Sequence, residues 1–366
     1  MKISLTGIGA VIIAVCFAVD VLGSSDGSGG HDSASGSSAI QWSLFELPVG
    51  ATPVFVQAEF HLLDIEKIVD EDETFEFSGV LTLIWQDSRQ AFDPTVVGAQ
   101  EIIYHGSYQF NELAPAWYPQ VVLANATNVQ EMQGVLLRVK PDGTSKLVQT
   151  VNATARSALN LRRYPFDSQR LEAVFEILGF DDSEVVIQQG EMTVNDTRIQ
   201  IPQWDLLDIS SSTRLLAAPY AGDSGNSSAL VVALELKRQP FFMMRLVVLP
   251  LIIIMILSWS VFWMDRSSLG DRMAVSFVGI HTAVAYQTMV SSIMTQISYV
   301  TLMHGFLYYS FLLMCATVVV NLVVGNYDRR GDFERGDLID RRCRWIFPLV
   351  YAVLVTTVVI IAFNRF

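Results

Sequence analysis

The 366-residue sequence predicts an all-β sandwich outside the membrane, followed by a bundle of four transmembrane helices. Charge is divided unevenly: residues 1–240 hold 14 Lys or Arg and 30 Asp or Glu, whereas the last 126 residues hold 10 and 7. Short runs rich in β-branched and aromatic residues fill the acidic part, and long uncharged runs fill the remainder. The acidic balance excludes nucleic acid as a partner, because phosphates require a basic surface.

The chain begins with the pattern of a secretory signal. Lys2 precedes an apolar run over residues 8–19, and a Gly/Ser-rich tract follows. We expect a signal peptide over 1–23 and a flexible linker over 24–38, since the apolar run is too short to cross about 30 Å of hydrocarbon. An additional membrane helix is the alternative.

Residues 39–239 have the pattern of an immunoglobulin-like β-sandwich. Two runs, 135–139 and 147–151, are joined by Lys140-Pro141-Asp142-Gly143, which predicts a hairpin. Further strands are expected over 75–85, 170–178, 185–188, 204–211 and 230–237. Strands of this length and spacing are typical of an antiparallel sandwich.

Residues 240–366 are expected to form four membrane-spanning helices joined by short links. Their expected ranges are about 241–263, 273–293, 301–325 and 345–363, with a short cytoplasmic linker over 326–344. The linker contains six arginines and the link before the second span contains Arg266 and Arg272, whereas 291–300 contains none. Because Lys and Arg favour the cytoplasmic side, the sandwich and the C-terminus are expected outside the cytoplasm.

The second span carries a stripe of small and hydroxylated residues. At about 100° per residue the stripe is roughly 80° wide, and Asp271 lies just off its cytoplasmic end. Its members are Ala274, Val278, His281, Ala285, Thr288 and Ser292. Several copies around a rotation axis could enclose water, so we expect a ring of identical subunits with this helix innermost. Close packing of small residues between helices is the alternative.

Several motifs occur in a specific order along the chain. Tyr164-Pro165-Phe166-Asp167 resembles the aromatic-Pro-aromatic-Asp loop of the pentameric ligand-gated ion channels, also called Cys-loop receptors. Supporting matches are Trp85-Gln86-Asp87, Trp117-Tyr118-Pro119, Lys237-Arg238-Gln239-Pro240-Phe241 and Gly270-Asp271-Arg272-Met273. The two cysteines that flank the loop in animal receptors correspond to Ser157 and Leu171, and the linker is short. Both traits resemble the prokaryotic branch, so a bacterial inner membrane is the expected location.

The resemblance implies a homopentamer in membrane lipid that conducts inorganic cations when a small molecule or a proton acts as agonist. Asp271 corresponds to the acidic ring of cation-selective members, and carboxylates at a narrow mouth do concentrate cations. Arg272 is the counter-argument, although the neighbouring basic position in the family usually turns away from the axis. An anion-selective member of the family and a non-conducting membrane receptor are the alternatives.

His281 stands where the family usually has a hydrophobic gate residue. Imidazole gains positive charge as pH falls from 8 to 5, so we expect acid to suppress the cation current. The alternative is a rotated helix in which His281 packs between helices.

Two further sets of residues follow from the resemblance. The agonist site would place Trp85 on one face and Trp117, Phe180 and Tyr220 on the other, because aromatic faces suit an ammonium group. For Trp117 and Phe180, core packing is an equal alternative. Coupling between sandwich and helices is expected to involve Asp70, Tyr164, Pro165, Phe166, Asp167, Arg238 and Tyr299, with Asp167 pairing with Arg238.

Enzyme motifs are not found in the sequence. It has no Cys/His cluster with zinc spacing, no phosphate-binding Gly loop and no Gly-x-Ser-x-Gly elbow. We therefore expect no catalytic residues, no metal site, no cofactor and no enzymatic activity.

Overall fold

A computed structural model describes residues 46–48, 52–106, 116–128, 131–194, 199, 201–219, 224–265, 269–292, 294 and 298–365. All of these belong to one compact unit, Gln41–Phe366. The expected signal peptide and Gly/Ser linker lie outside the described residues, and so does Tyr220.

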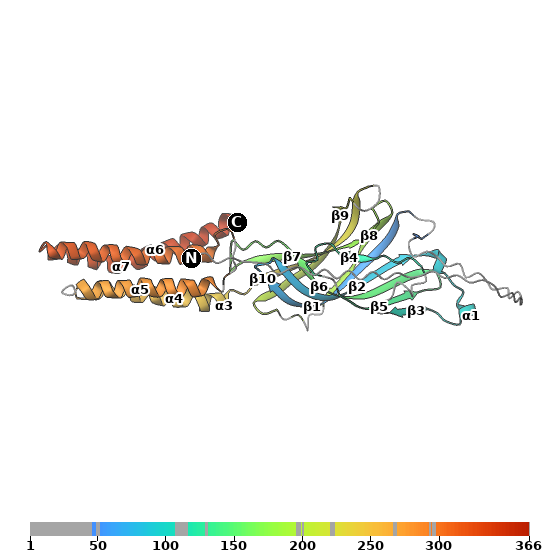
Figure 1. The fold of residues 1–366 in the computed structure, drawn as a ribbon, viewed down its shortest axis with the longest axis horizontal. Coiled ribbons are helices and arrows are strands. Elements are labelled where there is room, and N and C mark those ends of the chain that lie inside the picture. Colours follow the sequence, from blue (N-terminus) through green and yellow to red (C-terminus); the bar gives the residue numbers. More distant parts are fainter. Residues whose placement is uncertain are drawn as a thin grey trace, which may run out of the picture. The chain divides into compact units, whose positions relative to one another are not determined.

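Two β-sheets form the sandwich (Figure 1). The strands are β1 (Val54–Val69), β2 (Thr74–Gln86), β3 (Ile102–Gly106), β4 (Val121–Leu123), β5 (Glu131–Val139), β6 (Thr144–Arg156), β7 (Ser168–Ile177), β8 (Val185–Val194), β9 (Trp204–Ala217) and β10 (Asn226–Arg238). The larger sheet has the order β3-β5-β6-β2-β1-β8 and the smaller one β4-β7-β10-β9. Neighbouring strands are antiparallel, apart from the parallel pair of β1 and β8. The expected sandwich is confirmed.

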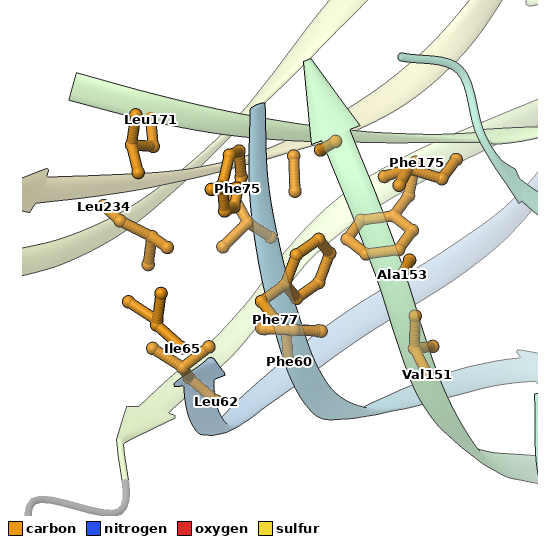
Figure 2. Close-up of a cluster of buried hydrophobic side chains, with 14 of the residues drawn as sticks. Phe60, Leu62, Ile65, Phe75, Phe77, Val151, Ala153, Leu171, Phe175 and Leu234 are labelled. Atoms are coloured by element: carbon orange, nitrogen blue, oxygen red, sulfur yellow. The ribbon is translucent and has the colours of Figure 1, made fainter. Parts of the chain in front are cut away.

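The core of the sandwich lies between the two sheets, and alternation along the strands builds it. Every second residue of β2 and β6 is buried, as period-two patterning requires. Figure 2 shows Phe60 and Phe77 from the larger sheet meeting Phe175 from the smaller one. The Phe175 ring centroid lies 5.5 Å from that of Phe60 and 6.4 Å from that of Phe77. Each fully buried ring contributes about 1.5–3 kcal/mol through burial alone.

The structure adds strands that the sequence did not single out. β1, β3 and β4 are absent from the expected set, and β1 is the longest strand of the sandwich. Its inward residues are apolar, but polar residues such as Gln57, Glu59 and His61 occupy the alternate positions. This mixed composition hides a strand that is half-buried and paired on both sides.

The first membrane-spanning segment is helical from Phe241 to Trp263 but not uniform. It consists of α3 (Phe241–Met243), a π-helical turn (η2, Met244–Val248), α4 (Leu249–Trp259) and a 3-10 turn (η3, Ser260–Trp263). Pro250 has no N–H, so the carbonyl four residues earlier, on Leu246, loses its helical donor. The hydroxyl of Tyr286 donates to that carbonyl and, at 3.2 Å, to the carbonyl of Val247. A side chain from the next span therefore satisfies the interrupted backbone.

Three more helices complete the bundle: α5 (Leu269–Ser291), α6 (Leu302–Arg329) and α7 (Phe333–Arg365). Consecutive helices from α4 to α7 contact one another. Among the described residues, three helices are long and apolar enough to cross a membrane: Phe241–Trp263, Leu269–Ser291 and Leu302–Arg329. The fourth expected span, 345–363, lies within α7.

Two helix boundaries differ from the sequence expectation. The second span begins at Leu269 and not at Met273, so Asp271 lies in its first turn, where the helix dipole favours a carboxylate. The linker expected over 326–344 is mostly helical, because only 330–332 separate α6 from α7. Charged pairs at helical spacing, such as Asp337 and Arg341 at 3.1 Å, stabilise this part of α7.

Two glycines of the β5–β6 hairpin provide a matched test of its turn. Gly134 and Gly143 have φ of +77° and +86°, so alanine at either position costs about 1–2 kcal/mol. A Cβ on Gly143 would also meet the carbonyl oxygen of Asp87 at 2.5 Å, whereas one on Gly134 would meet nothing within 4 Å.

Gly143→Ala is therefore expected to lower the free energy of unfolding by about 1 kcal/mol or more beyond the loss in Gly134→Ala. Thermal unfolding of the two purified variants in detergent measures the difference. Equal losses would contradict the close approach of the turn to Asp87.

Candidate functional site

Strand register brings Arg238 beside two residues that are distant in sequence. Arg238 ends β10 and lies directly opposite Trp204, the first residue of β9. On the other side of β10, Lys237 pairs with Ser168, which places Asp167 next to Arg238. The backbone N–H of Arg238 donates to the carbonyl of Asp167 at 3.1 Å.

The guanidinium of Arg238 is buried between two carboxylates and two aromatic rings. Its Nε donates to Asp167 at 2.9 Å, and Nη2 contacts Asp70 at 2.9 Å. The guanidinium carbon lies 4.0 Å from the ring centroid of Trp204 and 4.8 Å from that of Tyr164. Only 4% of the Arg238 side chain is exposed, so solvent does not screen these interactions as it would at the surface.

The protonation states of this cluster follow from its environment. Burial alone would lower the pKa of Arg238, but the hydrogen bond with Asp70 and the charges of Asp167 and Asp70 outweigh it and raise the pKa. Burial also raises the pKa of Tyr164 to about 12. At physiological pH the cluster therefore holds a charged guanidinium and a neutral phenol.

Loop residues near this cluster contact the helices directly. The N–H of Leu302, at the start of α6, donates to the carbonyl of Arg162 at 3.0 Å. The N–H of Leu161 donates to the hydroxyl of Tyr299 at 3.0 Å. Pro165 and Phe166 line an apolar cavity of about 120 Å³ together with residues of the helices. The lining helix residues are Met244, Val248, Leu302, Met303, Phe306, Tyr309, Val355 and Val359.

The structure thus brings together the residues expected to couple sandwich and helices. Asp70, Tyr164, Asp167 and Arg238 form one cluster, and Pro165, Phe166 and Tyr299 lie where the loop meets helix residues. Sequence reasoning missed Trp204, which packs on the same guanidinium. The sequence around Trp204 contains no motif that indicates a contact with Arg238. The pairing register of β9 with β10 places the two side chains together.

Ser157 closes the loop that contains Tyr164 and Asp167. Its hydroxyl donates to the carbonyl of Arg170 at 3.4 Å and accepts from the N–H of Glu172 at 3.1 Å. These two residues flank Leu171, so the loop ends are joined at the two positions expected to correspond to cysteines. Hydrogen bonds take the place of a covalent bridge.

The aromatic residues expected at an agonist site form one cluster within the protomer. The ring centroid of Trp117 lies 6.0 Å from that of Trp85 and 5.8 Å from that of Phe180, both in edge-to-face geometry. Trp85 and Trp117 are 2% and 1% exposed, whereas Phe180 is half-buried. Trp85 therefore does not occupy a face separate from Trp117. Burial favours core packing for both tryptophans and leaves Phe180 as the accessible member.

Asp181 ties the Phe180 loop to Ser224, just before β10. Its carboxylate accepts from the N–H groups of Ser183 and Ser224, at 2.8 and 3.0 Å. The Ser183 hydroxyl and these N–H groups lower the pKa of Asp181 to about 2, although burial opposes the shift. The ionised carboxylate of Asp181 therefore stabilises the fold at pH values above 3.8, the ordinary pKa of an Asp carboxyl. This stabilisation is lost as pH falls toward 2.

The two faces of α5 differ in burial. Arg272, Ser276, Ala283 and Val290 are buried and lie within about 40° of one another around the helix axis. The expected pore stripe lies on the opposite face, and every member is exposed in the protomer, as is Asp271. The exposed members are Ala274, Val278, His281, Ala285, Thr288 and Ser292.

No catalytic or metal-binding arrangement accompanies these features in the part of the chain that the structure describes. No group of three or more His, Cys, Asp or Glu side chains is placed to hold a metal ion there. The geometry instead places a buried charge cluster in the sandwich, beside loop residues that contact the helices.

Comparison with known proteins defines the class. Residues 41–240 match the neurotransmitter-gated ion-channel ligand binding domain, and residues 247–335 match the neurotransmitter-gated ion-channel transmembrane region. The chain belongs to this family of ligand-gated ion channels, whose members are not enzymes, and it is a multi-pass membrane protein.

Individual relatives span bacteria and animals. The chain is 26% identical to a proton-gated ion channel of Gloeobacter violaceus over 306 residues, which cover 83% of this chain and 82% of that one. It is 24% identical to the human gamma-aminobutyric acid receptor subunit rho-3 over 303 residues, which cover 80% of this chain and 63% of the subunit. The chain thus spans less than two thirds of the length of the animal subunit.

Replacement of Arg238 tests the charge cluster. Arg238→Gln leaves Asp70 and Asp167 facing each other without a counter-charge, which costs about 3–5 kcal/mol. We expect agonist-evoked current to disappear while subunits still assemble. Arg214→Gln is the control, because Arg214 pairs with Glu172 on the exposed surface and such pairs contribute little.

The measurement is current through channels in liposomes, together with size-exclusion chromatography for assembly. Full responses in Arg238→Gln would remove the cluster from the gating mechanism.

Proposed function

We propose that the chain forms a homopentameric, cation-selective channel whose opening is modulated by a small ligand or by protons. The observation that carries this proposal is the exposed stripe of small and hydroxylated residues with His281 on α5, which lies opposite the buried face of the same helix. Family membership supports the pentameric ring, with agonist binding between outer domains and a pore lined by the second transmembrane helix.

A lipid-facing position would be unfavourable for this face of α5. His281, Thr288 and Ser292 are polar, and polar groups in a membrane are favoured where they face water or other protein. A ring of subunits with α5 innermost provides that environment. The stripe would then run from Asp271 at the cytoplasmic mouth to Ser292 near the outer end.

Cation selectivity is the favoured choice because of the charges at the mouth. Asp271 is exposed on α5, whereas the adjacent Arg272 is buried on the other face. A ring of carboxylates at a narrow mouth attracts cations and repels anions. The side chain exposed at this mouth is thus the acidic one and not the basic one.

The agonist site is proposed around Phe180 and Tyr220, with Trp117 and Trp85 as the packed wall behind them. Ser224, four residues after Tyr220 in sequence, lies beside the Phe180 loop, because its hydroxyl donates to Asp182 at 2.5 Å. One relative is named proton-gated and others are named gamma-aminobutyric acid receptor subunits. Protons and small amines are therefore the two agonist classes to try first.

The proposed location is the bacterial inner membrane, with the sandwich and the C-terminus outside the cytoplasm. The six arginines between 326 and 344 support this orientation through the positive-inside rule. The proposed secretory signal over 1–23 agrees with it.

Reversal potentials under a salt gradient test ion selectivity. The wild type in liposomes is expected to reverse near the cation equilibrium potential, and Asp271→Asn is expected to move toward the anion value because it removes the carboxylate ring. Asp337→Asn removes a carboxylate from the partly exposed surface of α7 and serves as the control. Wild-type selectivity for chloride would overturn the assignment.

A second experiment tests His281. If acid charges a ring of imidazoles in the pore, lowering pH from 8 to 5 should reduce the cation current of wild-type channels that an amine agonist has opened, and His281→Leu should abolish that reduction. His105→Gln changes an exposed histidine of β3 and should keep the wild-type pH dependence. An unchanged pH dependence in His281→Leu would exclude His281 as the pore sensor.

A further inference from the structure

A buried polar network joins α5 to α6 and α7 at the end of the bundle that carries Asp271. Arg272 donates to both carboxylate oxygens of Asp340 on α7, at 3.0 and 2.7 Å. The same guanidinium donates to the side-chain oxygen of Asn321 on α6 at 3.1 Å. All three side chains are buried. The pair is bidentate, which is the strongest geometry for arginine and a carboxylate.

The network returns to α5 through Ser276. The amide of Asn321 donates to the Ser276 hydroxyl at 2.7 Å, and that hydroxyl donates to the carbonyl of Arg272 at 3.0 Å. A buried charge that lost its partner would be strongly destabilising. The first turn of α5 is therefore held by α6 and α7 through directional contacts and not only by apolar packing.

One consequence concerns the rotation of α5. Consecutive residues are about 100° apart around a helix axis, so holding Arg272 against α6 and α7 turns Asp271 out of the bundle. Asp271 is indeed exposed and Arg272 is 1% exposed. A bidentate contact allows only a narrow range of angles, which fixes this rotation.

The other consequence concerns charge. An unpaired Arg272 would lie one residue from Asp271, well within a Debye length of about 8 Å at physiological ionic strength. Its positive charge would then oppose the negative field of the carboxylate ring. Paired with Asp340, Arg272 contributes no net charge, so the field of Asp271 is not cancelled by its neighbour.

We propose that Asp340 and Asn321 are positioning residues for ion selectivity, because they neutralise Arg272 and hold it away from the pore mouth. The last helix thereby controls which ions pass, although it contributes no residue to the exposed stripe of α5. This inference rests on the proposed channel function and extends it to Asn321 and Asp340, which lie on helices outside the proposed pore lining.

The test compares reversal potentials in liposomes under a NaCl gradient. Asp340→Asn keeps the side-chain shape but removes the charge, so its reversal potential should shift from the wild-type value toward the chloride equilibrium potential. The double variant Arg272→Gln with Asp340→Asn removes both charges and should return to the wild-type value. Asp337→Asn, the control on the same helix, should cause no shift.

Each outcome decides the inference. If Asp340→Asn alters current size or assembly but not the reversal potential, Asp340 has only a structural role and the inference is wrong. If Asp340→Asn does not assemble, the double variant, which leaves no unpaired buried charge, still must match the wild type, and a shift would overturn the inference. The wild-type value tests the proposed cation selectivity separately, whereas the difference between the single and double variants tests Asp340.

Discussion

The burial of a single positive charge, that of Arg238, is the constraint that organises the junction of sheet and helix. A guanidinium removed from water must have carboxylate partners and ring faces around it, and these come from three separate segments: Asp70 after β1, Tyr164 and Asp167 before β7, and Trp204 in β9. If one of these segments moved alone, the buried guanidinium of Arg238 would lose a partner or become exposed to solvent. The loops that touch α6 are therefore linked mechanically to the strand that leads into the first span.

In the helical bundle, too, buried polar groups need hydrogen-bond partners, because the membrane interior contains no water. Two polar groups in its interior are bonded by side chains of neighbouring helices: Tyr286 donates to the carbonyl left open by Pro250, and Asp340 accepts from Arg272. Hydroxyl groups on the other face of α5 bond to their own helix, as Thr288 does to the carbonyl of Val284. The two faces of this helix therefore differ in their hydrogen-bond partners as well as in burial, which is the difference that the proposed pore-lining position of α5 requires.

Much of this architecture can be predicted from the sequence, because it depends on local patterns. Alternation predicts β2, β6 and β7, the Pro-Asp-Gly turn predicts the hairpin, and uncharged runs predict the spans. The partnership of Asp167 and Arg238 follows from motif resemblance. Trp204, Asn321 and Asp340 could not be found in this way, because strand register and helix packing select them across long separations. The two-face placement of Trp85 and Trp117 was wrong for a related reason: pattern shows that an aromatic residue lies in a strand, but not which neighbour its ring meets.

Loop closure by Ser157 has a consequence for biogenesis. The loop ends are joined by hydrogen bonds that form as the strands pair, and Cys315 and Cys343, the cysteines in the part of the chain that the structure describes, are both free thiols. The junction therefore requires no oxidant and no disulfide isomerase for its formation. We therefore expect this loop to close during cell-free translation in reducing buffer, with liposomes present during synthesis.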